Sequence, residues 1–233
     1  LRTGHPIGFE ALIRWQHPRL GLIAPGEFLN VAEENGFIVP IGGWVLKKAC
    51  RQISDWHTRF PMTPPLCVCV NLSGKQFLQA GFFEQVQWCL RATGLDPLAL
   101  KLDITESDIM SDPDTAAAML DRLRSLGVGV SLDDFGTGYS SLSCLRRFPI
   151  DTLKIDRSFV DLKATDDKDM VILQAIVTLA HSLSMDVVAE GLEGAQQVER
   201  LRRLGCEYGQ GYYFSKPLNV EDAERWLASV LQE

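Results

Sequence analysis

Long apolar runs are missing from this sequence of 233 residues. Charged residues, Gly or Pro interrupt every apolar stretch well short of the roughly 20 residues that a membrane-spanning helix needs. A basic start followed by an apolar segment, the mark of a signal peptide, is also absent. We therefore expect a cytoplasmic domain that makes no membrane contact of its own, and leave open whether the full-length protein is membrane-attached.

Paired cysteine spacings are absent as well. The six cysteines stand in apolar surroundings without the spacing of zinc sites or redox motifs: Cys50, Cys67, Cys69, Cys89, Cys144 and Cys206. We interpret them as reduced core residues. There is no excess of positive charge either, because the formal net charge is -7, and this argues against binding to a nucleic-acid polymer. A small phosphorylated ligand stays open, because a metal ion can supply positive charge locally.

Short runs of Val, Ile and Leu alternate with amphipathic stretches, which is typical of strand-helix units around a parallel sheet. The expected strands cover residues 7–13, 66–70, 99–104, 129–133, 152–155, 186–189 and a short segment near Tyr208. The expected helices cover residues 43–59, 115–126, 170–183 and 194–204. No Gly-rich phosphate-binding turn follows any of these strands, so a closed barrel is favoured over a dinucleotide-binding sheet.

The predicted fold is therefore an α/β protein of the (β/α)8, TIM-like barrel class, with residues 1–233 as a single domain. Only seven strands can be counted, and the chain opens with a turn-like Arg2-Thr3-Gly4 that leads straight into a strand. We expect the first strand to lie upstream of residue 1, in a domain that is incomplete at its N-terminus and part of a larger protein.

Polar residues stand at or near the carboxyl end of every expected strand, where barrel enzymes assemble their active sites. In chain order they are Glu10, Asn71, Asp103 with Glu106, Asp133, Asp134, Lys154, Glu190 and Gln210. A single carboxylate at such a place is more often a helix cap or a loop anchor. Seven strand ends in register are better explained by a shared site.

The chemistry of this set favours a divalent metal. Burying several carboxylates together is costly, and Lys154 alone cannot compensate five or six acids. The ligands are all oxygen atoms, which is typical of Mg²⁺ or Mn²⁺. The adjacent Asp133 and Asp134 suit a site in which one carboxylate bridges two ions about 3.5–4 Å apart, as in two-metal phosphodiester cleavage.

Other chemistries are less well supported. His5, His17, His57 and His181 lie in turns or helices and not at strand ends, so a Ser-His-Asp hydrolase is disfavoured. The segment "DFGTGYSS" lacks the Lys-Ser/Thr ending of a P-loop. We interpret it as a mobile loop with Gly hinges beside the metals.

Seven motifs in order, "FEALIRWQHP", "VNLS", "DITES", "DDFGTGYSSL", "LKIDRSFV", "AEGLE" and "QGYYFSKP", resemble those of the EAL-domain cyclic di-GMP phosphodiesterase family over essentially the whole chain. The resemblance implies a (β/α)8 barrel that hydrolyses cyclic di-GMP to linear pGpG with two Mg²⁺ or Mn²⁺ ions. It also implies a homodimer and fused sensory or GGDEF-type domains.

The resemblance assigns roles residue by residue. Glu10, Asn71, Asp103 and Asp133 would hold one metal ion, and Asp133, Asp134 and Glu190 the other. Lys154 would lie beside the nucleophilic water, with Glu190 as the alternative proton acceptor. Arg14 would contact a substrate phosphate, Gln210 would order the water or ligand shell, and Glu106 would anchor the loop from Asp134 to Ser141.

Asp103 departs from the family, which usually has Glu at this position. The side chain is one methylene shorter, so its carboxylate reaches less far by up to about 1.5 Å. We expect weaker metal binding and favour retained activity, because the other motif residues are intact. The alternative is a catalytically weak or inactive domain that senses cyclic di-GMP by binding it. A protein-interaction module without nucleotide binding is poorly supported, since Arg14, Asn71 and Lys154 all remain.

Overall fold

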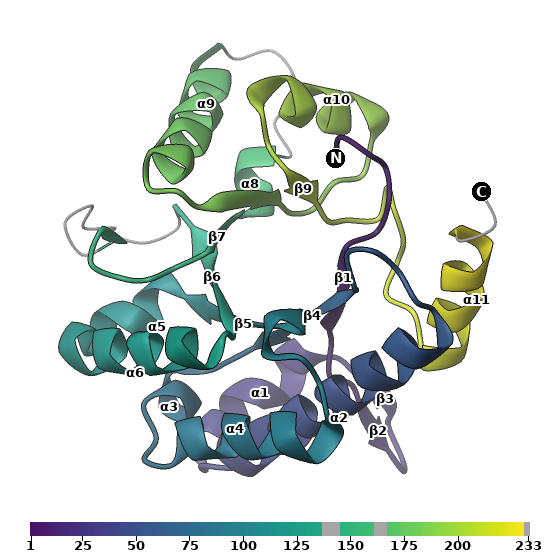
Figure 1. The fold of residues 1–233 in the computed structure, drawn as a ribbon, viewed down its shortest axis with the longest axis vertical. Coiled ribbons are helices and arrows are strands. Elements are labelled where there is room, and N and C mark those ends of the chain that lie inside the picture. Colours follow the sequence, from purple (N-terminus) through teal and green to yellow (C-terminus); the bar gives the residue numbers. More distant parts are fainter. Residues whose placement is uncertain (137–144, 161–166, 231–233) are drawn as a thin grey trace. The chain divides into compact units, whose positions relative to one another are not determined.

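The computed structural model describes residues 1–136, 145–160 and 167–230 (Figure 1). The chain divides into two compact units. The N-terminal unit comprises residues 7–104 and 108–129, and the C-terminal unit comprises residues 1–6, 105–107 and 130–233. Among the described residues, no helix is both long and apolar enough to cross a bilayer.

Three parallel strands form the centre of the N-terminal unit, in the order β1 (Gly8–Ala11), β4 (Cys67–Asn71) and β5 (Leu100–Thr105). Side chains alternate between the two faces of a strand. Val70 and its register partner Leu102 are almost fully buried on one face, and the following pair, Asn71 and Asp103, lies on the other. The sheet therefore has an apolar side and a side that carries polar groups.

The other elements of this unit surround the strands. They are β2 (Trp15–His17), β3 (Gly21–Ile23), α1 (Pro25–Glu34), α2 (Ile38–Arg59), α3 (Gly74–Phe77), α4 (Phe82–Thr93), the 3-10 helix η1 (Pro97–Ala99) and α6 (Pro113–Leu126). Helix α5 (Glu106–Ser111) follows β5. Helix α6 is well delimited, because the Asp112 side chain accepts a hydrogen bond from Thr115 N and Gly127 ends the helix at positive φ.

Four parallel strands form the centre of the C-terminal unit, in the order β6 (Gly129–Phe135), β7 (Thr152–Ile155), β8 (Asp186–Ala189) and β9 (Tyr208–Gly209). Its helices are α8 (Arg157–Val160), α9 (Asp167–Ser182), α10 (Ala195–Leu204) and α11 (Val220–Val230). Figure 1 shows α9 and α10 on the outer side of these strands. All four residues of β7 are buried, Lys154 included.

Carboxylates hold the starts of these strands in register. Asp151 Oδ2 accepts a hydrogen bond from Val130 N, and Glu207 Oε2 accepts one from Val187 N, each at 2.9 Å. Because each bond satisfies a backbone N–H near the start of a strand, it helps to fix where that strand begins. Their carboxyl ends, which carry the candidate site residues, are thereby aligned.

All seven expected strands and all four expected helices are present; the strands over residues 152–155 and 186–189 have the expected ends, and the other elements are shifted at one end or both. The expected strand over residues 7–13 ends at Ala11, and the hairpin β2–β3 that follows was not predicted. The expected helix from Gly43 begins earlier, at Ile38. Gly42 and Gly43 lie inside this helix, where a Cβ at Gly42 would overlap the side chain of Gln76 and a Cβ at Gly43 that of Gln85. The glycines therefore mark close packing and not a helix start.

Candidate metal centre

An irregularity at the end of β6 sets the geometry of the candidate site. Leu132 pairs with Leu153 and Phe135 pairs with Ile155, so three steps along β6 match two along β7. The extra residue is a β-bulge, which redirects side chains at the end of a strand. In a regular strand the neighbouring Asp133 and Asp134 would point to opposite faces. The bulge removes that restriction.

The backbone of Asp134 has an unusual conformation for a residue other than Gly. Its φ is 52°, in the left-handed region, and its N–H donates a hydrogen bond to Asp133 Oδ1 at 3.0 Å. A left-handed non-Gly residue costs roughly 1–3 kcal/mol, least for Asp and Asn. This conformation lets both aspartates present carboxylates to one place.

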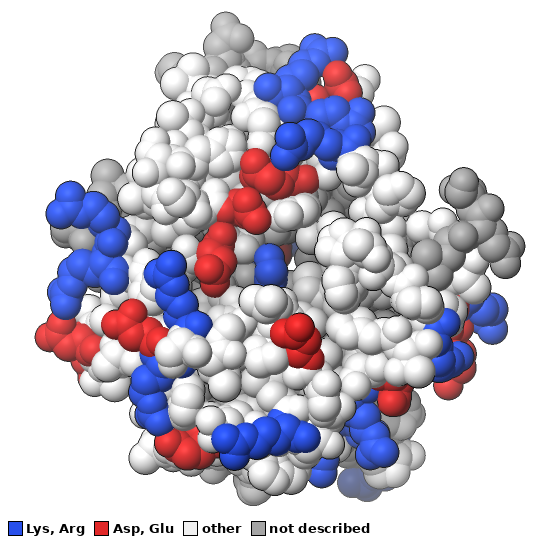
Figure 2. All heavy atoms as spheres, in the orientation of Figure 1, with Lys and Arg blue, Asp and Glu red and all other residues white. Residues whose placement is uncertain are grey.

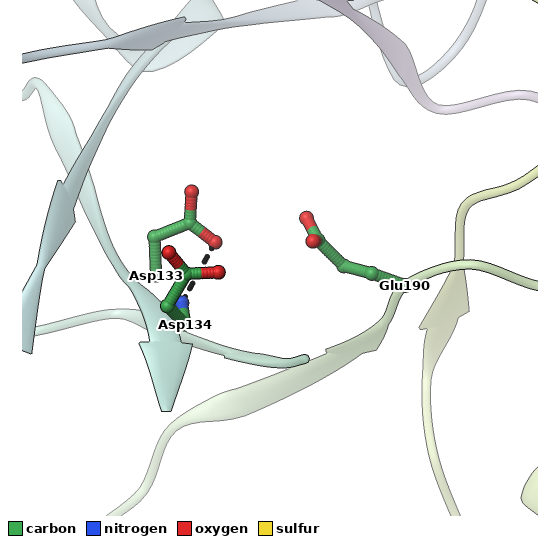
Figure 3. Close-up of side chains that lie close together, drawn as sticks. All are labelled: Asp133, Asp134 and Glu190. Atoms are coloured by element: carbon green, nitrogen blue, oxygen red, sulfur yellow. Dashed lines mark hydrogen bonds between the residues drawn. The ribbon is translucent and has the colours of Figure 1, made fainter. Parts of the chain in front are cut away.

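Three carboxylates converge at this place. One oxygen from each of Asp133, Asp134 and Glu190 lies within 4.8 Å of the others. Figure 3 shows the two aspartates at the tip of β6, with Glu190 reaching toward them from the chain that follows β8. Glu190 N donates to Ile155 O at 3.1 Å, which fixes its backbone beside the end of β7. Figure 2 shows a row of acidic side chains over the β7–β9 region.

Lys154 is the cation of this cluster. Its Nζ lies 3.2 Å from Asp133 Oδ1 and 2.6 Å from Glu190 Oε1, and its side chain is only 3% exposed. The partner carboxylates are 14% and 21% exposed, so the pair is screened less than a surface ion pair would be. Lys154 thus fixes Asp133 and Glu190 relative to each other.

The cluster carries more negative than positive charge. Burial raises the pKa of Asp134, and the nearby charges of Asp133 and Asp156 raise it further, while Lys154 lowers it. Three carboxylates with one ammonium leave a net charge of about −2 when all are ionised. A divalent cation would compensate this charge, and the available donors are oxygens that suit Mg²⁺ or Mn²⁺. The residues present therefore fit such an ion.

The predicted ligands of the N-terminal unit also lie together. Asn71 Nδ2 donates to Glu10 Oε1 at 2.5 Å, and Asn71 is the register partner of Asp103 on the neighbouring strand. All three side chains are on the same face of their strands, because Glu10 is in register with Cys69, two residues before Asn71. Asp103 is buried, with 1% of its surface exposed.

The remaining predicted residues lie in segments that follow strands. Arg14 is exposed beyond β1, and its Nη1 donates to Ile13 O at 2.7 Å. Gln210 directly follows β9, and its N–H donates to Ala189 O at 2.8 Å, which places it beside the end of β8. Glu106 begins α5 and is 7% exposed. The predicted loop from Asp134 to Ser141 extends into residues 137–144, which lie outside the described residues.

Two residues that shape the site, Asp156 and Gly191, were not predicted from the sequence. Asp156, two residues beyond Lys154, contributes to the raised pKa of Asp134, and its own position at a strand end was a usable signal. Gly191, directly after Glu190, has φ +67°, and a Cβ there would overlap Arg157 Cβ. Only Gly fits this position without strain, so it helps to fix the backbone of Glu190.

Taken together, parallel strand-helix units with carboxylate and amide oxygens at the carboxyl ends of their strands define an α/β protein with a candidate site for divalent metal. The chain matches the family model described as "EAL domain" over residues 1–217. It therefore belongs to the EAL domain family.

Relatives of known name support this membership. "Bifunctional diguanylate cyclase/cyclic di-GMP phosphodiesterase MucR" of Pseudomonas aeruginosa is 47% identical over 232 residues, which cover 98% of this chain and 33% of the relative. "Oxygen sensor protein DosP" of Escherichia coli is 42% identical over 229 residues, covering 98% and 28%. The chain thus spans about a third of the length of these curated relatives.

Solved structures share the fold. A structure described as "PaMucR Phosphodiesterase, c-di-GMP complex" is 46% identical and superposes with a TM-score of 0.88, covering 93% of this chain and 87% of that one. The EAL enzyme Bd1971, in a "cAMP and cyclic-di-GMP bound form", is 34% identical with a TM-score of 0.90 and covers 98% of this chain and 61% of that one. These likenesses confirm the predicted TIM-like α/β barrel class.

Proposed function

We propose that this chain is a cyclic di-GMP phosphodiesterase that opens one phosphodiester of its substrate to give linear pGpG. The observation that carries the proposal is the cluster of Asp133, Asp134 and Glu190 around the buried Lys154. It occurs in a chain 47% identical to a relative whose name includes cyclic di-GMP phosphodiesterase. Both the chemistry of the cluster and the family support hydrolysis of a phosphodiester.

Two divalent ions, Mg²⁺ or Mn²⁺, are proposed as cofactors. Asp133, Asp134 and Glu190 would hold one, and their oxygens are close enough to share an ion. Glu10, Asn71 and Asp103 are proposed as ligands of the other, together with Asp133, and this assignment rests on the family resemblance. Bound ions would lower the pKa of a water molecule and neutralise charge on the phosphate.

Lys154 and Glu190 are the proposed catalytic residues. The ammonium of Lys154 is held between two carboxylates, so its position is fixed and its positive charge is stabilised. That charge would favour a hydroxide-like state of a neighbouring water. Glu190, with 21% of its side chain exposed, remains accessible to solvent and is the alternative acceptor of the water proton.

Arg14 and Gln210 are proposed to bind the substrate. A guanidinium has five N–H donors in a planar fork, and the bond to Ile13 O uses one of its nitrogens. Arg14 is exposed, and a bidentate contact with a phosphate would suit it. Gln210 follows Gly209, the register partner of Ala189, and so lies beside Glu190 at the ends of β8 and β9. We propose that its side chain orders water or ligand there.

The proposal extends to the protein around this chain. Because the chain covers about a third of its relatives, we propose fused domains of the sensory or GGDEF type, and one relative is named as both a diguanylate cyclase and a phosphodiesterase. Homodimerisation is likewise proposed. Glu106, buried at the start of α5, is proposed to anchor the loop after Asp134.

A turnover assay tests the proposed activity. The purified protein is incubated with cyclic di-GMP and Mg²⁺ or Mn²⁺, and pGpG is separated and quantified over time. We expect metal-dependent formation of pGpG that chelator abolishes. Glu10→Ala and Asp133→Ala should each abolish turnover while circular dichroism shows a folded protein. Tight binding of cyclic di-GMP without any pGpG would instead identify a sensor and overturn the enzyme proposal.

A further inference from the structure

Two tryptophans and a group of basic side chains form a continuous surface on α2 and α4. Trp44 and Trp88 are 56% and 53% exposed, although large aromatic side chains contribute most to stability when buried. Lys47 Nζ lies 5.0 Å from the ring centroid of Trp88, and Lys48 Nζ lies 5.9 Å from that of Trp44. We call these four residues, with Arg51 and Arg91, the Trp-Lys strip.

The strip is continuous because the two helices run parallel and in contact. A Cβ at Gly43 would overlap Gln85 Nε2, and further along Ser54 Oγ donates to Thr93 O at 2.9 Å. Between these points Lys47 crosses to Trp88. The strip therefore extends over about two turns of α2, from Trp44 to Arg51, which is about 10 Å, and over about one turn of α4, from Trp88 to Arg91.

The charge of this surface is opposite to that of the chain. The exposed basic residues of α2 and α4 are Lys47, Lys48, Arg51, Arg59 and Arg91, and the exposed acidic ones are Asp55 and Glu84. Glu84 is already paired with Arg122 at 2.7 Å. Figure 2 shows Lys and Arg side chains in the region where Figure 1 draws α2 and α4. A local positive excess in a chain of formal net charge -7 is suited to an anionic partner.

We propose that the Trp-Lys strip binds the surface of a membrane rich in anionic lipid headgroups. Lys and Trp together are typical of membrane interfaces, where the rings lie at the headgroup level and the ammonium groups meet lipid phosphates. The proposal reverses the expectation, drawn from the missing apolar runs, that this domain makes no membrane contact. Such runs are needed to span a bilayer, whereas binding at its surface needs only a basic face with aromatic anchors.

Two other occupants fit less well. A second copy of the chain, docked through the same strip, would place the positive charges of one copy against those of the other. A protein partner would have to cover Lys47 and Lys48, and lysine is depleted in protein interfaces while arginine is enriched. Two half-exposed tryptophans also offer much less than the roughly 800 Å² per partner of a stable protein interface.

Vesicle flotation tests the proposal directly. The purified protein is mixed at about 0.1 M salt with vesicles of phosphatidylcholine alone or of phosphatidylcholine with phosphatidylglycerol, and the floated fraction is measured. We expect binding only to the anionic vesicles, and its loss at about 1 M salt, where the Debye length falls to about 3 Å. Equal binding to both vesicles, or none to either, would overturn the proposal.

Charge-reversal variants locate the contact. Lys47→Glu with Lys48→Glu should lower partitioning at least about 20-fold, because each basic residue near an anionic surface contributes roughly a factor of five. The matched control, Arg19→Glu with Arg124→Glu, changes the net charge equally at exposed positions outside the strip and should retain most binding. An equal loss in both double variants would mean that only net charge matters and would contradict a defined strip.

A second measurement addresses the tryptophans. Brominated phosphatidylglycerol should quench part of the intrinsic fluorescence, and Trp44→Ser with Trp88→Ser should remove that quenching. Persistent quenching in this variant would place the contact at another of the five tryptophans. Because the strip lies on helices outside the proposed catalytic set, hydrolysis of soluble cyclic di-GMP should be unchanged in every variant. Failure of the membrane proposal is thereby distinguishable from failure of the proposed activity.

Discussion

Replacing Lys154 by Met should expose how much of the site depends on one cation. At an effective dielectric constant of about 20, a charge pair at 3.2 Å is worth about 5 kcal/mol and one at 2.6 Å about 6 kcal/mol before desolvation is counted. Most of this gain is offset by the cost of burying an ammonium that is 3% exposed. Removing one partner of a buried pair nevertheless costs about 3–5 kcal/mol, because the other charges stay behind.

Urea denaturation of Lys154→Met, in chelator and then with Mn²⁺, measures this effect. We expect the free energy of unfolding in chelator to fall by about 3–5 kcal/mol, and pGpG formation to be lost. Since an ion at Asp133 and Glu190 would replace part of the missing positive charge, Mn²⁺ should stabilise the variant more than the wild type. Lys75→Met is the control: this lysine is exposed and its Nζ donates one hydrogen bond, to Glu33 O at 2.8 Å, so the free energy of unfolding should fall by only about 1 kcal/mol or less.

The result that would refute this reasoning is specific. If Lys154→Met kept its stability in chelator within about 1 kcal/mol of the wild type, the buried ion pairs could not be holding the cluster. Full turnover by the variant would separately remove Lys154 from the catalytic set. An equal response of both proteins to Mn²⁺ would argue that the ion binds elsewhere.

Three further predictions concern proposed metal ligands and one of their neighbours in the chain. Because the pKa of Asp134 is raised in the folded protein, the stability that this residue contributes is complete below its unfolded pKa and is lost as pH rises through its folded pKa. Asp134→Asn should therefore raise the free energy of unfolding of the metal-free protein at pH 7, and this gain should vanish in acid. Asp103→Glu should raise turnover at limiting metal, and an unchanged metal dependence would mean that residue 103 is not a ligand. Gly191→Ala should lower turnover, because a Cβ at this position would overlap Arg157 and displace the neighbouring Glu190. Melting curves should show an accompanying loss of stability of about 1–3 kcal/mol. Thr178→Ala, at an exposed helix position, is the control, and equal turnover in the two variants would contradict the prediction.

Much of the fold could be predicted because most of the buried parallel strands appear in the sequence as short runs rich in Val, Ile and Leu. Residues 152–155 are buried on both faces of the sheet, and within this run the charged Lys154 stands out between the apolar Leu153 and Ile155. Lys154 was recognised in this way before its partners were known. The hairpin β2–β3 was not, because its Trp15 and Leu22 are exposed and carry no inward pattern.

The sequence predicted that Asp133, Asp134, Lys154 and Glu190 share a site, and these residues do lie together, but their geometry was not predicted. Alternation along a strand predicts that the side chains of Asp133 and Asp134 point to opposite faces of the sheet, and the local sequence gives no signal of a β-bulge. The bulge depends on the pairing of β6 with β7, which is a contact between segments about 20 residues apart. The role of Gly191 depends in the same way on Arg157, a neighbour in space only.

Asp134 destabilises the folded protein in two ways, through its backbone conformation and through its charge, and the fold itself requires neither. The left-handed backbone is strained, and the carboxylate faces like charges from Asp133 and Asp156. Asn would tolerate the same backbone without the charge, and Gly would remove both costs. A residue that combines strain with electrostatic repulsion is explained by a ligand that binds there, since binding to the folded state alone offsets both costs. A divalent cation bound by these carboxylate oxygens is the ligand that this geometry favours.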